Sequence, residues 1–600
     1  MYTYTRNACT RQQNRRDIAG ERTRRRRCSS LLFSPFFVLA LALALWSTSY
    51  SVAEAARPPH QVRRRTGTSR QTATTPALVR LALAGKDELG QSNGMTVSWT
   101  TQVETKASLV LYGTDAKNLS SRQEGYQQKY LYTSHHHVTL QNLKPSTTYF
   151  YTCGDDDTNT NTDTDTDLEG SSRSQVFSFQ TAPSLATGAG ANQSFTIAIY
   201  GDMGAGDCSA ETRQQLQNTY DGIDWVWHLG DIAYADDYLF GEFAYERVLD
   251  QYMEEMAFLA ARKPYMVLPG NHEVDCHAFV CLLDKTYRDA LKNFTAYNAR
   301  WKMPSKESDG ILNMWYSFNY GQAHFVSLDS ETDYKGAYEG EIDRFFILKS
   351  GHFSPEANGY LKWLERDLQQ AFNERHMRPW IIVAGHRPMY LHDDVGVFRA
   401  AVEELLLKYE VDLYLSGHVH EYYRTFPVRN GSDYVPHYDN RQGRLTNVIA
   451  GGPGADWLGT TGTTGTTSSP LASAGFEWIL NGLSQTISRA SAATRRKVRD
   501  GRLTLTRVLG HLNPFKGVST RTHTRSGLDH HEEDSVVKEQ AKRESENKCM
   551  EDNGDKYEYL AFCSYEKSFG LLHFVDENTI KWELISSKTG EVLDTLQLTK

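Results

Sequence analysis

Positive charge is not in excess in this sequence, and a full-length membrane-spanning run is lacking. Lys and Arg number 65 against 73 Asp and Glu, so the 600 residues carry a net charge of −8. Such a chain offers no general basic surface, and we expect no nucleic-acid partner. The apolar run from Leu31 to Trp46 is interrupted by Ser34 and Pro35. It is shorter than the roughly 20 residues of a typical spanning helix, so we expect no stable membrane span.

The N-terminus has the pattern of a targeting segment. Arginines crowd the first thirty residues, the apolar run follows them, and Ala53-Glu54-Ala55 then supplies a small-x-small cleavage pattern. We interpret residues 1–56 as a signal peptide with a long basic first part. The alternative is an uncleaved signal-anchor, and a nuclear signal is the weakest option. The prediction is a secreted protein or one in an endomembrane, vacuolar or lysosomal lumen.

Cysteine usage fits this oxidising route. Two of the eight cysteines, Cys9 and Cys28, lie in the predicted signal segment, which leaves six. Six cysteines allow fifteen pairings. Sequence proximity favours Cys276 with Cys281 and Cys549 with Cys563, while buried free thiols remain the alternative. Sequons that would be glycosylated on the same route stand at Asn118, Asn192, Asn293 and Asn430.

The length and the hydrophobic content of 40% predict two structured domains with unstructured segments between and before them. Residues 57–75 form a Ser/Thr-rich leader. Short β-rich runs spaced by turn residues then predict an all-β sandwich over 76–183. The stretch from Leu143 to Tyr151 resembles the fibronectin type III pattern, in which a tyrosine pins a corner of the sandwich. Within this region, we interpret the three histidines His135 to His137 as a solvated turn that runs into a strand, and not as a metal site.

Over residues 194–458 apolar runs alternate with helix-like segments. The expected helices are 210–221, 243–261, 356–372 and 398–409. This alternation predicts a layered α/β domain. Residues 459–556 are low in complexity and then mixed in charge, which predicts a disordered insert. Strand-like runs return over 557–600, and we expect them to close an edge of the α/β domain.

Five apolar runs of the α/β region end in the same way, with glycine beside a side chain that can bind metal. The runs lead into Gly201-Asp202, Gly230-Asp231-Ile232-Ala233-Tyr234, Gly270-Asn271-His272-Glu273, Gly385-His386 and Gly417-His418-Val419-His420. Ligands of open α/β sheets bind beyond the carboxyl ends of the strands. We therefore expect these five motifs to converge on one site.

The side chains at these ends are oxygen and nitrogen ligands: Asp202, Asp231, Tyr234, Asn271, His386, His418 and His420. Seven ligands suit two metal ions, and Asp231 is the best candidate to be shared. Two ions about 3.5–4 Å apart are the usual arrangement for hydrolysis of phosphoryl groups. The absence of thiolate excludes copper(I) and iron–sulfur centres. A bound tyrosine, whose pKa is about 10, favours Fe(III) over a divalent ion.

The five motifs, in this order, closely resemble the signature blocks of purple acid phosphatases, a family of binuclear metallophosphoesterases. The resemblance covers roughly residues 75–455 and 557–595. It implies two mixed β-sheets flanked by helices, preceded by the fibronectin III-like sandwich. It also implies small phosphorylated substrates and hydrolysis of phosphate monoesters in acid, by in-line attack of a metal-activated hydroxide.

The resemblance also implies roles for single residues. Asp202, Tyr234, His420 and the bridging Asp231 would hold Fe(III). Asn271, His386, His418 and the same Asp231 would hold a divalent ion, which is Zn, Mn or Fe(II). Asn271 and His272 would contact the substrate, and His272 would protonate the leaving group or bind phosphate. The alternative for His272 is support of the metal ligands.

The sequence departs from the family pattern in two places. Plant members carry a histidine pair after the block that matches His386, whereas this chain has only His392, followed by Asp393 and Asp394. We expect His392 either to bind phosphate or to lie on a plain surface loop, and the nearby acids disfavour highly anionic substrates such as phytate. The insert from Ser484 is also atypical, and it is a lid, a linker or a gene-model artefact.

Two other functions remain open. One is a phosphodiesterase or nucleotide pyrophosphatase on the same site, although Tyr234 disfavours it, because such enzymes commonly have histidine near that place. The other is a non-catalytic binding protein that uses the fibronectin-like domain. That hypothesis predicts missing ligands, and none is missing. A homodimer is also left open by the sequence.

Overall fold

The structure is a computed structural model that describes residues 73–86, 93–156, 172–183, 194–237, 242–274, 291–338, 352–391, 396–438, 443–454 and 548–600. Several predictions fall outside these residues. They are the signal peptide, most of the leader, most of the insert, the Cys276 and Cys281 pair, Asn192 and His392. Among the described residues, no helix has the length and the apolar character needed to cross a bilayer.

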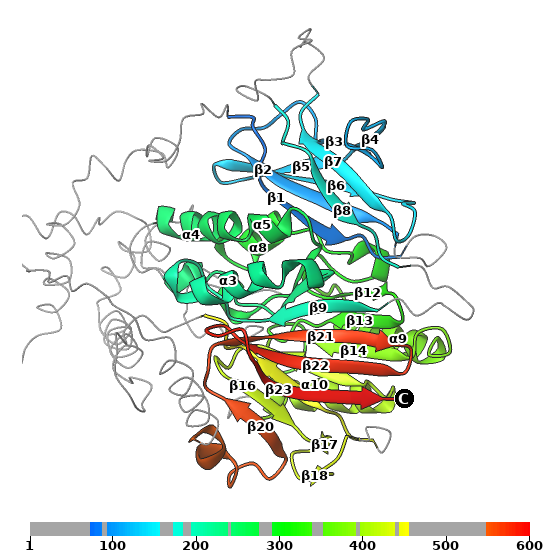
Figure 1. Ribbon diagram of the computed structural model, residues 1–600, viewed down its shortest axis with the longest axis vertical. Helices are drawn as coiled ribbons and strands as arrows, with labels where there is room; N and C mark the ends of the chain where they lie inside the picture. Colours follow the sequence, from blue (N-terminus) through cyan, green and yellow to red (C-terminus); the bar gives the residue numbers. More distant parts are fainter. Residues whose placement is uncertain are drawn as a thin grey trace, which may run out of the picture. The chain divides into compact units, whose positions relative to one another are not determined.

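The N-terminal part is a β domain of two four-stranded antiparallel sheets (Figure 1). One sheet has the order β1-β2-β6-β5, from β1 (Ala77–Leu83), β2 (Met95–Thr101), β6 (Thr133–Leu140) and β5 (Tyr126–Tyr130). The other has the order β4-β3-β7-β8, from β4 (Ser121–Glu124), β3 (Leu109–Gly113), β7 (Thr148–Gly154) and β8 (Phe177–Gln180). Apolar side chains such as Trp99, Val138 and Tyr151 are fully buried in this domain. The backbone N–H of Lys144 donates to the hydroxyl oxygen of Tyr149 at 3.1 Å.

The prediction of a solvated turn at the three histidines is wrong. His135, His136 and His137 all lie inside β6, and none is more than 2% exposed. Each ring is hydrogen-bonded to hydroxyl groups of neighbouring residues, which are Ser98, Thr100 and Thr101 on β2 and Ser108 before β3. A run of polar residues can therefore form a buried strand, because each imidazole finds a partner. Burial lowers the pKa of His136 to about 4 and that of His137 to about 3.

The first sheet of the α/β domain has six strands and carries three of the five motifs. Its order is β11-β10-β9-β21-β22-β23. The parallel strands are β9 (Phe195–Tyr200), β10 (Trp225–His228) and β11 (Tyr265–Val267). The antiparallel strands come from the C-terminus: β21 (Ser568–Asp576), β22 (Thr579–Ser586) and β23 (Val592–Thr599). The C-terminal run thus joins the sheet directly beside β9, as Figure 1 shows.

The second sheet has seven strands in the order β12-β13-β14-β15-β19-β16-β20. Its strands are β12 (Tyr316–Tyr320), β13 (Ala323–Ser327), β14 (Trp380–Ala384), β15 (Leu413–Ser416), β19 (Asn447–Ala450), β16 (Tyr422–Thr425) and β20 (Leu560–Ser564). Strands β13, β14, β15 and β19 are parallel, and the others pair antiparallel. The prediction of two mixed sheets is confirmed. A short hairpin of β17 (Val428–Arg429) and β18 (Asp433–Tyr434) follows β16.

Aromatic side chains pack the two sheets together. Trp225 on β10 meets Phe325 on β13 with ring centroids 5.0 Å apart, and Phe325 also meets Phe574 on β21 at 5.8 Å. The indole N–H of Trp227 donates to Ser327 Oγ at 3.1 Å. These residues are fully buried, and large buried rings contribute much of the apolar area that holds such layers together. The packing brings the ends of both sheets to one place.

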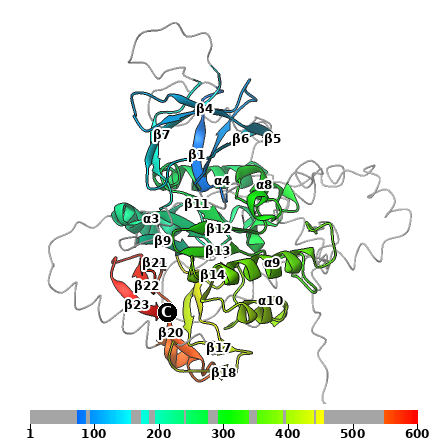
Figure 2. The same ribbon diagram turned by 90° about the vertical axis from the view of Figure 1, so that its right-hand side faces the viewer.

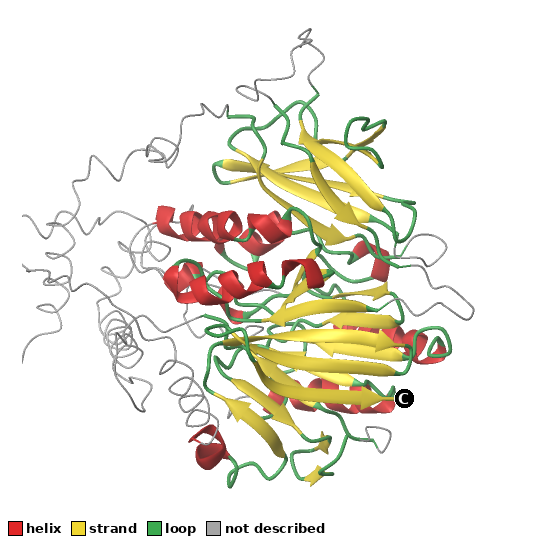
Figure 3. Cartoon of the chain, viewed as in Figure 1, coloured by secondary structure: helices red, strands yellow, loops and turns green. Residues whose placement is uncertain are grey.

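Helices flank the sheets (Figures 2 and 3), and most of them lie where the sequence predicts helices, while the short helix Thr295–Arg300 was not predicted. They are α3 (Ala210–Asn218), α4 (Glu242–Glu255), α5 (Ala257–Ala260), α8 (Thr295–Arg300), α9 (Gly359–Asn373) and α10 (Gly396–Lys408). Short 3₁₀ turns mark the loops: η2 (Asp207–Ser209), η3 (Tyr220–Gly222), η4 (Ala235–Asp237), η5 (Asn271–Glu273) and η6 (Lys306–Ser308). Helices α9 and α10 lie together on the side of the seven-stranded sheet (Figure 2).

One disulfide is present among the described residues, and it confirms a predicted pairing. Cys549 and Cys563 are bonded across 14 residues. Cys563 lies on β20, and residues 548–553 before it form a helical segment. Closing such a loop restricts the unfolded chain and so stabilises the fold. Cys153, by contrast, is a buried free thiol.

Candidate metal centre

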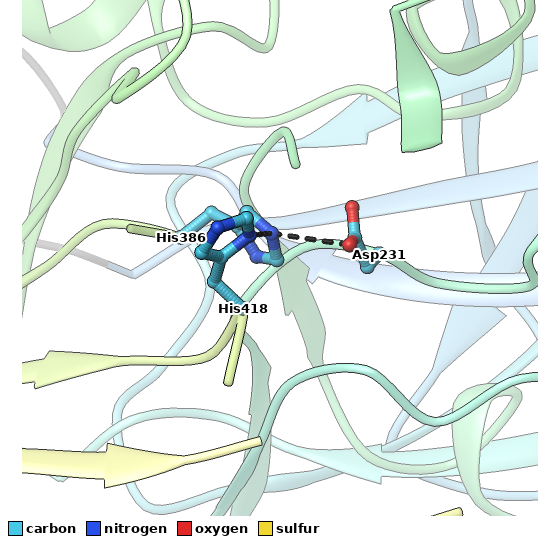
Figure 4. Close-up of side chains that lie close together, drawn as sticks. All are labelled: Asp231, His386 and His418. Carbon is cyan, nitrogen blue, oxygen red and sulfur yellow. Dashed lines mark hydrogen bonds and ion pairs between the residues drawn. The ribbon is translucent and has the colours of Figure 1, made fainter. Parts of the chain in front are cut away.

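The loops after β9, β10, β11, β14 and β15 meet at one place, as the strand-end motifs predict. The loops after β11, β14 and β15 contribute three atoms that lie close together. His418 Nδ1 lies 2.9 Å from Asn271 Oδ1 and 3.3 Å from His386 Nε2, and the last two atoms are 3.1 Å apart. Figure 4 shows the two imidazoles side by side and facing Asp231. We call Asn271, His386 and His418 the amide–imidazole group.

A second group of atoms comes from the loops after β9, β10 and β15. The hydroxyl of Tyr234 lies 2.9 Å from Asp202 Oδ1 and 2.6 Å from His420 Nε2. His420 Nε2 is itself 3.4 Å from Asp202 Oδ1. We call Asp202, Tyr234 and His420 the phenol group.

Asp231 touches both groups with the same oxygen. Its Oδ2 lies 3.1 Å from Nε2 of His386 and 3.4 Å from the hydroxyl of Tyr234. Its other oxygen, Oδ1, accepts the backbone N–H of His272 at 2.9 Å. The side chain is almost fully buried. The structure therefore brings all seven predicted ligands together, with one carboxylate between two sets of three.

The backbone at the site is strained. Asp202, Asp231, Tyr234 and His418 all have positive φ values, between 51° and 70°. This left-handed region is uncommon for residues other than glycine, and such residues concentrate at functional sites. Because of these φ values, the loops turn sharply after each strand, and their side chains point to the same place.

Glycine is required next to two of the carboxylates. A Cβ on Gly270 would lie 2.2 Å from Asp231 Oδ1, and one on Gly417 would lie 2.4 Å from Asp202 Oδ2. Neither distance is compatible with a real side chain. The glycines of the motifs thus allow one loop to pass close to the carboxylate of another.

Glu273 connects two of the loops. Its carboxylate accepts the backbone N–H groups of Asp231, Ile232 and Gly270 at 2.8–2.9 Å. Burial and the nearby Asp231 carboxylate raise the pKa of Glu273 to about 7. Its three hydrogen bonds fix the position of Asp231 relative to the loop that carries Asn271.

The buried carboxylates of the site favour a positive charge close to them. Burial alone would raise the pKa of Asp231, but His386 and His272 hold it well below its ordinary value. Burial alone would lower the pKa of His386, but Asp231 and Asp202 raise it to about 10. The carboxylates thus favour a proton on His386, and a bound metal cation would supply positive charge in its place. Bound cations are often the largest local charges in such a site.

The residues fit two metal ions. Among the described residues, Asp231, His386 and His418 form a group whose ligand atoms lie within 4.8 Å of one another. Every potential ligand is oxygen or nitrogen, and lone-pair atoms from different loops face one another at hydrogen-bonding distance or slightly beyond. Such a set suits zinc, iron or manganese and not a soft thiolate metal.

His272 lies beside the two groups, and Asp236 contacts its ring on the side away from them. Its Nδ1 is 2.8 and 2.9 Å from the two oxygens of Asp236, which is buried, while its Nε2 is 3.9 Å from Asp231 Oδ2. The ring also packs against Tyr234 with centroids 4.3 Å apart. Its side chain is 20% exposed. One nitrogen is therefore fixed by a carboxylate, and the other faces the centre.

Three residues at or near the site were not singled out in the sequence. They are Asp236, Arg387, whose Nη1 lies 3.2 Å from Nε2 of His418, and Glu331, which forms an ion pair with Arg387. Asp236 stands two positions after Tyr234, and Arg387 directly follows His386, so position next to a motif was a usable signal for both. Glu331 lies in the loop after β13 and gave no such signal. His392, the predicted phosphate-binding residue, lies outside the described residues.

Comparison with known proteins places this geometry in a family. The sequence matches the family described as "Purple acid Phosphatase, N-terminal domain" over residues 76–181, and the one described as "Calcineurin-like phosphoesterase" over 195–422. "Purple acid phosphatase 21" of Arabidopsis thaliana is 30% identical over 365 residues, which is 59% of this chain and 68% of that protein. The chain belongs to the purple acid phosphatase family.

Other relatives of the purple acid phosphatase family agree. "Acid phosphatase" of Aspergillus ficuum is 30% identical over 57% of this chain and 72% of its own length. "Acid phosphatase type 7" of Homo sapiens is 32% identical over 61% of this chain and 76% of its own length. The solved purple acid phosphatase PPD1 from yellow lupin (Lupinus luteus) seeds covers 88% of this chain and 74% of its own, with a TM-score of 0.53 and 18% identity, which shows a shared fold. All seven candidate ligands lie inside the matched range 195–422.

Proposed function

We propose that this purple acid phosphatase hydrolyses phosphate monoesters in acid at a centre of Fe(III) and one divalent ion, Zn, Mn or Fe(II). The observation that carries the proposal is the contact of one Asp231 oxygen with both the amide–imidazole group and the phenol group. A single bridging carboxylate between two sets of ligands is what a pair of neighbouring ions requires. The names of the relatives, acid phosphatase and purple acid phosphatase, support the reaction.

We assign the phenol group with Asp231 to Fe(III), and the amide–imidazole group with Asp231 to the divalent ion. Tyr234 supports the first assignment, because binding of its phenolate needs a strongly acidic ion. The amide oxygen of Asn271 is a neutral ligand, which suits the less highly charged ion. His386 donates from Nδ1 to the carbonyl of Leu229 at 2.8 Å, and this leaves Nε2 for a cation.

When bound, the two ions would neutralise charge on the phosphate and lower the pKa of water, so that a nucleophile is available in acid. The protein supplies the positioning and the proton transfer. Asp236 holds Nδ1 of His272, so Nε2 of the same ring carries the proton that can pass to the leaving oxygen of the ester. Asn271 stands next to His272 and supplies an amide group on the substrate side. Glu273 keeps Asp231 in place while the charge of the phosphate changes.

The setting of the enzyme is also a proposal. The disulfide between Cys549 and Cys563 supports a route through an oxidising compartment, in line with a signal peptide over 1–56. The hydrogen bond from Lys144 to Tyr149 supports a fibronectin III-like sandwich over 76–183, because a tyrosine bonded to the backbone upstream is typical of such corners. The catalytic region would then be 194–458 with 557–600, and small phosphorylated molecules its substrates. We leave a homodimer as a proposal to be tested by the mass of the protein in solution.

The proposal is tested by metal analysis of the purified protein together with hydrolysis of an aryl phosphate monoester and the matching diester between about pH 4 and 8. We expect two metals per chain, one of them iron, and hydrolysis of the monoester that is fastest in acid. Preference for the diester would favour a phosphodiesterase. A protein that hydrolyses neither compound with both metals bound would contradict the proposal.

A further inference from the structure

The loop after β13 contains a carboxyl group that the chain shields from water. Asp329 follows the end of β13 by two residues and is fully buried, as are its neighbours Glu331 and Thr332. Asp333, at the end of the same short stretch, is 7% exposed. Three acidic side chains thus lie close together in the sequence and inside the protein. A buried carboxylate is costly unless a cation or several hydrogen bonds stabilise its charge.

Two of these acids have partners that suit a negative charge. Glu331 forms an ion pair with Arg387, in which Nε lies 2.8 Å from a carboxylate oxygen. Asp333 accepts the backbone N–H groups of residues 353–354 at 2.8–3.1 Å. Nδ1 of His352 also lies 3.9 Å from Oδ1 of Asp333. Both side chains can therefore remain ionised in the interior.

Asp329 has no charge partner of this kind. Its Oδ1 accepts the backbone N–H groups of Glu331 and Thr332 at 2.8 and 3.2 Å, and no lysine, arginine or histidine of the described chain contacts its carboxyl group. Burial raises the pKa of Asp329 well above its ordinary value, and the nearby Asp333 and Glu331 carboxylates add to the shift. The titratable groups around it are Glu331, Asp333 and Tyr334 on its own loop, Tyr297 on α8 and Tyr360 on α9. None of them can carry a positive charge.

The hydroxyl of Thr332 lies between two of the carboxyl groups. Its Oγ1 is 2.5 Å from Oδ2 of Asp329 and 2.7 Å from Oδ2 of Asp333. A hydroxyl group has one hydrogen to donate, and an ionised carboxylate only accepts hydrogen bonds. Thr332 can therefore donate to one of the two carboxyl groups, and the other contact needs a hydrogen on the carboxyl group itself. Asp329 is the better place for that hydrogen, because Asp333 has the imidazole of His352 nearby.

The same loop supports the chain segment that carries a metal ligand. Ser330 Oγ accepts the backbone N–H of Arg387 at 2.9 Å and donates to Glu331 Oε1 at 2.9 Å. Arg387 directly follows His386, so Ser330 and Glu331 together hold the residue next to a candidate ligand. We call Ser330 and Glu331 the brace. Asp329 directly precedes the brace in the sequence, so a change of its charge acts on both contacts with Arg387.

We propose that Asp329 keeps a proton in the folded enzyme, and that this proton makes the brace depend on acid. In acid the carboxylic acid of Asp329 donates to Thr332, whose hydroxyl donates to Asp333. When a rise in pH removes the proton to the solvent, a third buried negative charge joins those of Glu331 and Asp333, and their repulsion weakens the brace. The inference goes beyond the proposed function, and only its effect on turnover rests on that function.

The first test looks for the proton itself in the metal-loaded full chain. The infrared difference spectrum between wild type and Asp329→Asn near neutral pH should contain the C=O stretch of a buried carboxylic acid. Asparagine has the shape of the protonated side chain and can donate to Thr332 in its place, so this variant should fold. If it does not fold, Thr332→Val decides, because loss of the hydroxyl should shift the frequency of the same band.

The matched control is Asp594→Asn. Asp594 on β23 is also buried, but it contacts Arg424 twice at 2.7 Å. An arginine keeps its charge at every pH of the experiment, so Asp594 should be ionised and its variant should remove no carboxylic acid band. The variant should lose stability by a similar amount at each pH above about 5, where a carboxylate with an arginine partner does not titrate.

The second test measures stability against pH. The unfolded chain releases the proton of Asp329 above about pH 4, whereas the folded chain keeps it, so the wild type loses stability as the pH rises from there through the folded-state pKa. Asp329→Asn lacks this loss. In that range its unfolding equilibrium constant should rise less steeply with pH than that of the wild type, by up to about tenfold per pH unit.

The third test measures hydrolysis of an aryl phosphate monoester across pH. Asp329→Asn should keep the wild-type kcat in acid, since asparagine replaces a neutral group there, and its activity should extend to higher pH. An unchanged pH profile would overturn the acid-dependent brace. The absence of a carboxylic acid band from Asp329, or equal stability slopes in the two proteins, would overturn the whole inference.

Metal analysis closes one further possibility. A third metal ion per chain that Asp329→Asn loses would overturn the inference, because a cation and not a proton would then join the two carboxyl groups. A wild type that binds two metals but hydrolyses no monoester would contradict the proposed function instead. The infrared and stability tests would still decide whether Asp329 holds the proton.

Discussion

Both oxygens of Asp236 lie within 2.9 Å of Nδ1 of His272, and Asp236 itself is buried. The contact orients the imidazole so that Nε2 points toward Asp231 and the centre. The pair gives a specific expectation for catalysis.

Substitution of Asp236→Asn should lower kcat by roughly 10- to 100-fold and keep both metals, because the ring loses its fixed orientation and its charge partner. Steady-state kinetics beside metal analysis check this. A normal kcat with both metals bound would mean that the contact with Asp236 does not position His272 for proton transfer.

The phenol group should give the protein its colour. With Fe(III) bound, Tyr234→Phe removes the phenolate and should bleach the visible absorption band while leaving the fold intact. The hydroxyl of Tyr234 contacts Asp202, Asp231 and His420, which are themselves candidate metal ligands. Visible spectroscopy with iron analysis is the measurement. A colourless wild type that is active without iron would contradict the Fe(III) assignment.

Removal of the shared carboxylate should affect both ions. Asp231→Ala deletes the oxygen that contacts His386 and Tyr234, so both metals should be lost or strongly weakened and turnover should fall by more than about 1,000-fold. By comparison, His418→Ala should release the divalent ion and keep the iron, with its colour. Metal content per chain separates the two cases, and wild-type turnover in Asp231→Ala would exclude a bridging role.

The strand of buried histidines should make the N-terminal domain sensitive to acid. The pKa of His137 is lowered to about 3 by burial and by Arg80, below the ordinary value near 6.5. The unfolded chain therefore binds more protons between these values. The stability that the neutral ring provides is complete above about pH 6.5 and declines as the pH falls toward 3.

Substitution of His137→Gln should flatten this decline, because glutamine does not titrate. The variant will lose some stability at neutral pH, since His137 bonds to Ser98 and lies 3.3 Å from the carbonyl of Ala299. The slope of the unfolding temperature against pH between about 6.5 and 4 is therefore the measurement, and not its absolute value. An equal slope in both proteins would show that this histidine is not a source of acid sensitivity.

Five of the seven candidate metal ligands could be predicted because each follows an apolar run and stands directly after a glycine, and Tyr234 and His420 belong to the motifs of Asp231 and His418. Local pattern fixes where a strand ends, and parallel strands place their ends together. Most helices and most strands also followed from the alternation of apolar and polar residues, but the short helix α8 did not. By contrast, β4 and β5 are polar and largely exposed, and no hydrophobic pattern marks them.

The local hydrophobic pattern could not predict contacts between side chains that are far apart in the sequence. Glu331 and Arg387 meet only because β13 and β14 are neighbours in the seven-stranded sheet, and strand order is not written in either segment. The burial of His135 to His137 depends likewise on hydroxyl groups of β2 that lie opposite them. Hydrogen-bond partners across a sheet, and not composition, decide whether such polar residues are inside or outside.

Strand β9, which leads to Asp202, is bordered by β10 on one side and by β21 on the other. Thr196 and His573, which are bonded across that second border, are 377 residues apart. During synthesis, the border with β21 forms only after residues 568–576 have left the ribosome. Until then one edge of β9 is an open template for other strands, so chaperone protection in this interval should determine how much active enzyme a cell recovers.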